Sequence, residues 1–499
     1  MGQNLSSEKR FILIPGNALS LFGGVIILTV LAFCGLAFYN IFFHPLSKFP
    51  GPKYAAATGW TWWIILWRGE LADWVKKMHD TYGEVVRVGP DRLSYISPQA
   101  CKDIYGHRTT KRLENPKDTR SYEPEFNGAD HIINVPDVAK HGELRKIFTN
   151  AFSDRALKLQ EPLINKYVDR LIENMHRMVK QRLDMVVLYN STTFDIMGEL
   201  AFGESLGLLE SSEYSPWVKA VFANIKVGAF SQVGLEYPLL GKLIKLCLPR
   251  SILELQKTHF QHSVDRVNRR MEKGNDQPDI WNLVLQKAGN KLSLDEMYAN
   301  SSIFMMAGTE TTATLLSGLT YHLLKSPDKL RIVTEEIRSL PEEELTLQNL
   351  PRLTYLSACF EEGLRCYPPV PVAPTREVAK GGNAICGQWI PEKTRVAVPN
   401  WAAYRSPLNF KDPESFIPER WLPGTGFDSD RKDVFQPFSS GPRNCLGKNL
   451  AYHEMRIILA KVLWHFDLQL CAESNNWADQ KTYGLWEKPE LWVQAKPRH

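Results

Sequence analysis

The stretch FSSGPRNCLGKNLA, residues 438–451, places one cysteine, Cys445, among glycines and a basic residue, directly before an apolar helical pattern. A thiolate is stabilised near a helix N-terminus, where free backbone N–H groups and the helix dipole favour negative charge. Gly441 and Gly447 let the backbone approach the sulfur closely, and Arg443 adds positive charge. The pattern indicates a metal-binding thiolate; a small buried cysteine near a helix start is the alternative.

The type of metal group follows from the number of ligands that the sequence offers. Cys445 has no second Cys and no His at ligand spacing, which disfavours tetrahedral zinc and an iron–sulfur cluster. A heme needs only one axial protein ligand, because its macrocycle supplies the other four. Cys445 is therefore a candidate axial ligand of a heme iron.

A second group of polar residues lies inside a long predicted helix, 293–325. Ser293 followed by Glu296 forms a capping box, and Pro327 lies just past the far end. The helix should therefore run for about thirty residues without a break.

The middle of that helix, AGTETT at 307–312, is unusual for a buried helix. It carries Ala307, Gly308, Glu310 and Thr311 where large apolar side chains are normally found. One interpretation is a packing notch lined by small residues. The other is an opened groove that carries an acid and hydroxyl groups toward a bound group.

The remaining composition limits the class of protein. The chain has 499 residues, with 60 Lys and Arg against 55 Asp and Glu, so its net charge of +5 gives no case for a nucleic-acid partner. Its 8 cysteines are scattered without CxxC pairs. This argues against a disulfide framework and structural zinc, and it favours a reducing, cytosolic compartment for the main domain.

The N-terminal region has the composition of a membrane anchor. Residues 18–43 are almost entirely apolar and uncharged, and as a helix they exceed the thickness of a bilayer core. Three prolines follow within 44–53, which predicts a stiff connection. We expect a short N-terminal segment (1–17), a transmembrane anchor (18–43), a proline-rich strap (44–53) and one large domain (54–499).

The large domain reads as mainly α-helical with small β-sheets. Alternating apolar and polar residues predict two hairpins, one over 82–98 and one over 482–495 with EKPE as its turn. Helical spacing or start signals occur at 154–182, 293–325, 326–339, 353–366 and 445–466. The apolar run 233–249 could dip into a membrane surface.

These motifs together resemble the cytochrome P450 family. FSSGPRNCLG matches the family's heme-binding signature FxxGxRxCxG at each fixed position, namely Phe438, Gly441, Arg443, Cys445 and Gly447. AGTETT is similar to the oxygen-activating stretch, with glutamate in place of the commoner aspartate. EGLR (362–365) supplies the ExxR motif, and PERW (418–421) resembles PERF, so the resemblance covers the whole chain.

The resemblance implies roles for the residues of the long helix and of the ExxR motif. Thr311 would hydrogen-bond dioxygen at the heme and Glu310 would relay protons, with Ala307 and Gly308 beside the cofactor. Glu362 and Arg365, three residues apart on one helix face, can form an ion pair, for which an exposed surface pair is the alternative. In the family this pair is buried and is joined by the arginine that corresponds to Arg420.

Heme propionates need cationic or hydrogen-bonding partners. Arg443 is a candidate from its own motif. The resemblance adds HGELR (141–145), which matches the family's WxxxR with His141 in place of tryptophan, and so implies Arg145. It also implies Arg376, which follows the family's strand beside the heme.

The implied protein has the cytochrome P450 fold, mainly α with small β-sheets (α+β), preceded by one transmembrane helix. It binds heme b through Cys445 and is anchored once in the endoplasmic reticulum membrane with its catalytic domain in the cytosol. No GxGxxG fingerprint is present, so electrons must come from a separate NADPH–cytochrome P450 reductase, with cytochrome b5 as a further electron donor.

The expected reaction is hydroxylation or epoxidation of a lipophilic small molecule. The motifs HPLSKFPGP and WEKP resemble filamentous-fungal members of secondary metabolism, such as trichothecene-pathway hydroxylases. A heme-thiolate desaturase, coupling enzyme or isomerase is the main alternative. A non-enzymatic heme sensor or carrier is a more distant one, since it would not need Thr311 and Glu310.

Overall fold

The computed structural model describes residues 16–107, 113–122, 125–211, 226–247, 250–272, 278–288, 291–372 and 374–498. Helices dominate these residues, and the strands form three small sheets. The predicted fold class, mainly α with small sheets, is confirmed. The predicted segment 1–17 lies almost wholly outside the described residues.

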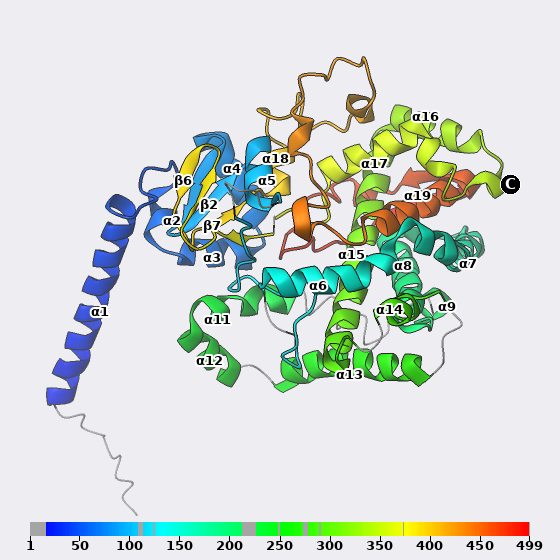
Figure 1. Cartoon of the computed structure of the whole chain (residues 1–499). Coiled ribbons are helices and arrows are strands. Elements are labelled where there is room, and N and C mark those ends of the chain that lie inside the picture. Colours follow the sequence, from blue (N-terminus) through cyan, green and yellow to red (C-terminus); the bar gives the residue numbers. More distant parts are fainter. Residues whose placement is uncertain are drawn as a thin grey trace, which may run out of the picture.

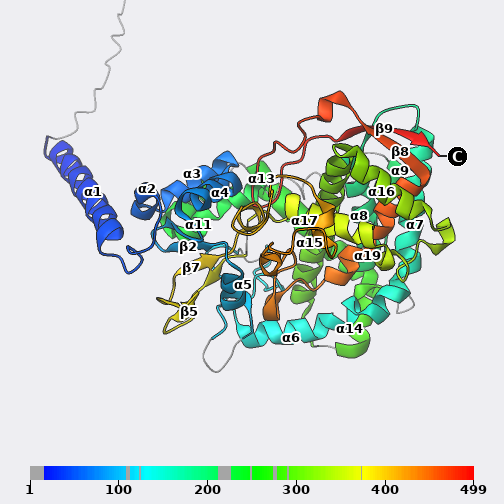
Figure 2. The same ribbon diagram turned by 90° about the horizontal axis from the view of Figure 1, so that it is seen from above.

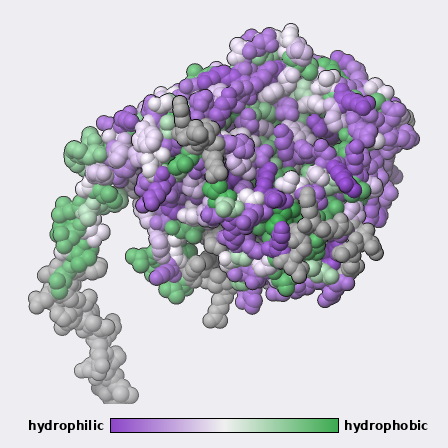
Figure 3. Space-filling model, in the orientation of Figure 1, coloured by the Kyte–Doolittle hydropathy of each residue, from purple (hydrophilic) through white to green (hydrophobic). Residues whose placement is uncertain are grey.

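Helix α1 (Gly16–Phe42) stands apart from the body of the molecule (Figure 1). Its stretch Gly23–Phe42 is long and apolar enough to cross a bilayer, and almost none of it is buried. Figure 3 shows it as a hydrophobic stalk beside a mainly hydrophilic body. By length and composition this helix is a candidate transmembrane span, close to the predicted 18–43.

The proline-rich connection after α1 is fixed to the body by its backbone and by two apolar side chains. Leu46 and Phe49 are buried. The Arg87 N–H donates to the Pro50 carbonyl at 2.7 Å, and the Arg87 guanidinium donates to the Asn40 carbonyl at 2.8 Å. The connection is thus packed against the first strand of the body.

The largest sheet has the order β1-β2-β7-β4, and it contains the predicted hairpin over 82–98. Its strands are β1 (Val85–Gly89), β2 (Arg92–Tyr95), β7 (Arg395–Ala397) and β4 (Arg376–Glu377). β1 and β2 pair antiparallel, as the alternating pattern predicts, whereas β2 and β7 pair in parallel across a long stretch of chain. β4 brings Arg376 to the edge of this sheet.

The second predicted hairpin, over 482–495, is wrong. Strand β9 (Trp492–Pro497) pairs with β8 (Phe466–Leu470) and β3 (Leu183–Asp184) instead of with the residues before EKPE. Only isolated bridges form near Thr482. Burial of side chains from the turn outweighs local strand pairing here, and Pro489 within the turn has no N–H to donate. A further short pair joins β5 (Asn383–Ile385) and β6 (Gln388–Ile390).

Helix α15 (Leu294–Leu324) passes through the centre of the helical part and confirms the predicted long helix. The capping box of Ser293 and Glu296 starts it as expected. It packs against α8 (Met185–Phe202), α17 (Thr354–Cys366) and α19 (Lys448–His465). Both views show these helices on the side of the body away from α1, with β2 and β7 on the nearer side (Figures 1 and 2).

The other helices surround this centre and the sheets. They are α2 (Lys53–Ala57), α3 (Trp60–Arg68), α4 (Leu71–Tyr82), α5 (Pro98–Tyr105), α6 (Val138–Phe148), α7 (Asp154–Met178), α9 (Leu208–Ser211), α11 (Val233–Glu236), α12 (Pro238–Cys247), α13 (Arg250–Glu272), α14 (Ile280–Ala288), α16 (Pro327–Arg338) and α18 (Asn400–Tyr404). The predicted helices at 154–182, 326–339 and 353–366 correspond to α7, α16 and α17.

Candidate active site

The loop before α19 holds Cys445 in a fixed conformation. The Cys445 N–H donates to the Phe438 carbonyl at 2.8 Å. Gly441 has φ +74°, and a Cβ atom there would lie 2.0 Å from the Tyr105 carbonyl oxygen, so only glycine fits. Gly447 precedes the first residue of α19, which begins at Lys448, three residues after the start of the predicted helical segment 445–466. The sulfur therefore lies a few residues before the helix N-terminus.

The Cys445 side chain is accessible to solvent, although neighbouring atoms surround it closely enough that burial raises the pKa of the thiol. The Gly447 N–H and the charges of Arg145 and Lys448 act in the opposite direction on this pKa. The expected contribution of Arg443 to the thiol is not seen. Its side chain points to other partners, and Arg145 takes that role.

Helix α6 supplies the residues of the HGELR motif. The Arg145 guanidinium donates to the carbonyl and to the side-chain oxygen of Asn444, next to Cys445. His141 lies one turn earlier on the same helix and is buried. The Asp137 side chain caps the helix by accepting the Lys140 N–H at 2.7 Å. The start of α6 is thus set by its own sequence.

Four basic side chains gather around His141, and we call the five residues together the cationic cluster. It consists of Lys117, His141, Arg145, Arg376 and Arg443. Burial and then the positive charges of the other four members lower the pKa of His141 to about 3, so His141 is neutral in the folded chain. Burial, together with Arg376 and Arg443, holds the pKa of Lys117 well below its ordinary value.

The cationic cluster has few negative partners among the described residues. Arg443 Nε donates to Glu114 Oε1 at 2.9 Å, and its terminal nitrogens donate to the carbonyls of Val135 and Pro136. Arg376 Nη1 is buried without a partner in the part of the chain that the structure describes. One carboxylate is thus matched to several buried cations, which is costly unless a further anion binds.

A heme with its two propionate carboxylates fits this arrangement. The cations and the unpaired Arg376 nitrogen supply donors for carboxylates, and the accessible Cys445 thiol lies near Arg145 of the same cluster. A Cβ added at Gly447 would meet only Phe152, at 4.0 Å. Lys117 is a member that the sequence analysis missed. No spacing rule singles out one lysine in a loop, and only its burial in the fold reveals it.

Two faces of α15 behave differently around the AGTETT stretch. Ala307, Gly308 and Thr311 are partly accessible, and the Thr311 hydroxyl donates to the Ala307 carbonyl at 2.7 Å. A Cβ at Gly308 would lie 2.7 Å from Met197 Sδ of α8, so this glycine also allows close helix packing. The structure thus places a packing notch at Gly308, whereas Ala307 and Thr311 lie on a partly accessible face.

Glu310 lies on the neighbouring, buried face of α15. Its Oε1 accepts from Lys488 Nζ at 2.5 Å and from the Thr314 hydroxyl at 3.4 Å. Lys488 Nζ also donates to Thr314 Oγ1 at 2.5 Å. The side chains of Glu310 and Lys488 are each only 4% exposed. Lys488 comes from the EKPE turn, and the sequence analysis gave it no role.

The ExxR motif and PERW meet in a second buried cluster, which we call the balanced cluster: Glu362, Arg365, Arg420 and Asp430. Arg365 makes two bonds of 2.8 Å to Glu362, and Arg420 bonds Glu362 at 3.1 Å and Asp430 at 2.6 Å. All four side chains are at most 1% exposed. Three residues that the sequence analysis grouped are thus in contact, and Asp430 is the member it missed.

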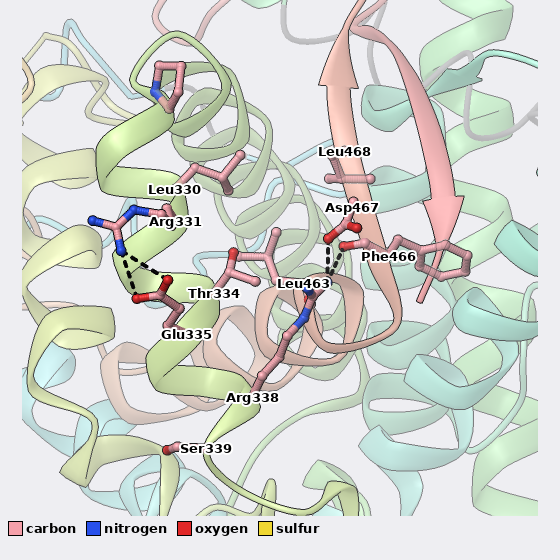
Figure 4. A pocket seen from close by; sticks show the side chains of 11 residues that line it. Leu330, Arg331, Thr334, Glu335, Arg338, Ser339, Leu463, Phe466, Asp467 and Leu468 are labelled. Carbon is pink, nitrogen blue, oxygen red and sulfur yellow. Dashed lines mark hydrogen bonds and ion pairs between the residues drawn. The ribbon is translucent and has the colours of Figure 1, made fainter. Parts of the chain in front are cut away.

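A surface hollow of about 520 Å³ lies elsewhere, between α16, the end of α19 and β8 (Figure 4). Ion pairs Arg331–Glu335 and Arg338–Asp467 lie along its wall. It borders the C-terminal end of α19, whereas Cys445 precedes the other end of this 18-residue helix, about 27 Å away by the usual helical rise. This hollow is therefore separate from the thiol.

Comparison with known proteins identifies the class of this chain. The family model "Cytochrome P450" matches residues 50–492. The chain is 53% identical to cytochrome P450 monooxygenase FUM2 of Gibberella moniliformis, covering 91% of this chain and 98% of the relative. It is 46% identical to cytochrome P450 monooxygenase efuB of Hormonema carpetanum, covering 92% and 93%. It is 39% identical to averantin hydroxylase of Dothistroma septosporum, covering 92% and 88%.

These relatives are fungal monooxygenases of secondary metabolism, which confirms the predicted resemblance, enzyme class and heme cofactor. The family holds heme through a cysteine thiolate, takes electrons from redox partners and acts on small molecules. The chain belongs to the cytochrome P450 family, the heme-thiolate monooxygenases.

Proposed function

We propose that this protein is a membrane-anchored monooxygenase that hydroxylates or epoxidises a lipophilic small molecule, with Cys445 as the axial thiolate of heme b. The observation that carries the assignment is the accessible Cys445 thiol, which precedes α19 and lies near the buried cations of the cationic cluster. Phe438, Gly441 and Gly447 shape the loop that presents it. When bound, the heme supplies the reductive activation of dioxygen.

The cationic cluster holds the two propionates. Arg376 is the strongest partner because one of its nitrogens is buried without an acceptor among the described residues. Burial and the charges of Arg376 and Arg443 lower the pKa of Lys117, so an anion beside these side chains relieves their repulsion. His141 fills the centre as a neutral side chain, and Arg145 fixes the loop through Asn444.

Thr311 on the open face of α15 and Glu310 on the neighbouring, buried face manage protons at this site. The Thr311 hydroxyl donates to the Ala307 carbonyl, so its oxygen keeps lone pairs that accept a hydrogen bond from water beside this face of α15. Glu310 is one residue away and supplies a carboxylate for proton transfer. Ala307 and Gly308 leave room beside the hydroxyl.

Membership of the cytochrome P450 family also leads us to propose a membrane location and redox partners. α1 anchors the protein once in the endoplasmic reticulum membrane, with the catalytic domain in the cytosol. Leu239 and Leu246 of α12 are 79% and 82% exposed, and α12 lies on the side toward which α1 extends (Figure 1). An NADPH–cytochrome P450 reductase in the same membrane supplies the electrons, and cytochrome b5 serves as a second donor.

The proposed reaction inserts one oxygen atom of O₂ into the substrate and reduces the other to water, using two electrons from NADPH and two protons. Averantin hydroxylase, a relative, is named for hydroxylation, which favours this outcome. The test is to compare metabolites of the native host with and without the gene, grown under ¹⁸O₂. A product that is lost in the deletion strain and labelled at an atom unlabelled in its precursor supports oxygen insertion. A lost product without label supports desaturation, coupling or rearrangement instead.

The role of Cys445 has a separate test. We expect the reduced protein to give the Soret shift typical of a thiolate-ligated heme on binding carbon monoxide, and Cys445→Ser to lose it completely. Cys471→Ser, at a free cysteine near β8 that is only partly buried, is the matched control and should keep the shift. If Cys445→Ser keeps the thiolate spectrum, another cysteine is the ligand and the assignment is wrong.

A further inference from the structure

The C-terminal turn reaches α15 through one buried lysine. Lys488 follows Trp486, whose ring stacks on Tyr367 at 4.8 Å and whose N–H donates to the Pro368 carbonyl at 2.8 Å. These contacts anchor the turn against the chain just after α17. Lys488 Nζ then lies 2.5 Å from both Glu310 Oε1 and Thr314 Oγ1.

The side chains of this ion pair are less exposed to solvent than those of most ion pairs among the described residues. Both side chains are 4% exposed, so Coulomb attraction between them is weakly screened. Burial lowers the pKa of Lys488, while the Glu310 carboxylate beside it acts in the opposite direction. Glu310 Oε2 has no partner in the described residues. Lys488 is therefore the cation that is paired with the buried Glu310 carboxylate.

The helix places this pair beside the open face rather than on it. Successive residues of a helix are about 100° apart, so Glu310 and Thr314 form one stripe, and Ala307 and Thr311 form the next. The open stripe is partly accessible, whereas the stripe of Glu310 is buried. Glu310 as it stands is thus turned to Lys488 and not toward the hydroxyl of Thr311.

We infer that Lys488 is a positioning residue for proton delivery: it holds the Glu310 side chain against the C-terminal turn, and the carboxylate reaches the Thr311 side only on leaving Lys488. This inference rests on the proposed function of the heme site. In this inference the EKPE turn, through Lys488, determines the position of the Glu310 carboxylate of α15. Only a proton moves in this step. The Glu310 carboxylate takes it up from the solvent side and passes it to the Thr311 side of α15.

The groups that face Glu310 define what a pH experiment can detect. They are Lys488 from the C-terminal turn, Thr314 from α15 and Tyr367 from the end of α17, and the pKa of Tyr367 is raised by burial and by the charge of Glu310. In the native chain the Lys488 ammonium lies 2.5 Å from Glu310 Oε1. Without that cation, a buried glutamate titrates near neutrality, at a pKa on the order of 8.

The experiment uses the heme-loaded full chain with NADPH and a fungal NADPH–cytochrome P450 reductase, without added substrate. NADPH consumption and hydrogen peroxide release are followed from pH 6 to 9. We expect Lys488→Met to gain an inflection near pH 8, on the order of the pKa of a buried unpaired glutamate. Lys488→Arg should lack the inflection, and so should the double variant with Glu310→Gln.

Thermal unfolding provides a readout independent of turnover. In Lys488→Met, the folded-state pKa of Glu310 lies above its unfolded value, so its contribution to stability is present at low pH and is lost as pH rises through the folded pKa. The loss of melting temperature relative to the native chain should therefore be larger at pH 8.5 than at pH 5.5. The double variant with Glu310→Gln should remove this dependence. Lys488→Gln, which keeps a donor, serves if the methionine variant does not fold.

The matched control is Lys226→Met. Lys226 pairs with Glu487, the neighbour of Lys488 in the turn, at 2.6 Å. The side chains of Lys226 and Glu487 are about half exposed, at 45% and 49%. We expect it to leave both pH profiles unchanged. If Lys488→Met and Lys488→Gln show no inflection while the native protein has a thiolate spectrum with carbon monoxide, the inference about Lys488 is wrong. If the native protein lacks that spectrum, the proposed heme function itself fails.

Discussion

In the described part of this molecule the balanced cluster and the cationic cluster are both buried, and they differ in how their charges are neutralised. The balanced cluster pairs Arg365 and Arg420 with Glu362 and Asp430, and neighbouring carbonyls accept the remaining donors. The cationic cluster has one carboxylate, Glu114. Closed networks of this kind serve the fold, whereas an excess of one charge implies an absent partner of opposite charge.

The balanced cluster braces three distant segments. Glu362 on α17 accepts from the Ile417 N–H at 2.7 Å and from Trp421 Nε1 at 2.9 Å, both in the PERW region. Arg365 donates to the Tyr404 carbonyl at 2.9 Å, at the end of α18. The network therefore fixes α17 against the chain that leads to the Cys445 loop, and its loss should be felt as instability.

The largest effect should come from opening the balanced cluster. Glu362→Gln leaves Arg365 and Arg420 buried with one charge fewer, and we expect a loss of about 3–5 kcal/mol in the free energy of unfolding. Denaturant unfolding followed by circular dichroism measures it. Glu335→Gln, which breaks an exposed pair with Arg331, should cost less than about 0.5 kcal/mol. Equal losses in the two variants would remove the distinction between the clusters.

The next effect concerns protons in the cationic cluster. The folded pKa of His141 is about 3, below its ordinary 6.5. Stability from neutral His141 is therefore fully present above pH 6.5 and falls as pH drops toward 3, at about 1.4 kcal/mol per pH unit. In heme-free protein, His141→Gln should remove this slope between pH 6.5 and 4.5. Urea unfolding at several pH values measures the difference between the two proteins.

Heme should reduce the same slope in the loaded protein, because propionates beside the cations raise the pKa of His141 toward its ordinary value. A His141→Gln variant that matches the native chain at every pH, with and without heme, would contradict the placement of His141 among these cations. The comparison thus distinguishes a cluster whose charges are neutralised by the protein from one whose charges are neutralised by a ligand.

The sequence predicted the parts of the fold that depend on local signals. The capping box at Ser293, the alternation in 82–98 and the fixed residues around Cys445 each act through near neighbours. The hairpin over 482–495 failed because β9 pairs with strands far away in sequence, which alternation alone cannot indicate.

The residues of the candidate site also divide into those that a local motif predicts and those that only the tertiary structure reveals. Arg145, Arg376 and Arg443 were found because each lies in a motif, and the fold brings them together around His141. Lys117 and Lys488 were missed because a lysine in a loop is normally solvated. Their burial beside Arg376 and Glu310 results from the tertiary structure, and no pattern of spacing contains it.

The smallest of these effects is the sharpest test of the comparison, because its sign differs between heme-free and heme-loaded protein. Arg376→Met removes a cation with an unpaired buried nitrogen, so the heme-free chain should be equally stable or more stable. Heme, in contrast, should dissociate about tenfold faster, the equivalent of about 1.4 kcal/mol for one charge-assisted hydrogen bond. Transfer of heme to an excess of apomyoglobin measures the rate. A loss of stability in the heme-free variant, with unchanged heme dissociation, would mean that Arg376 serves the fold as Arg365 does.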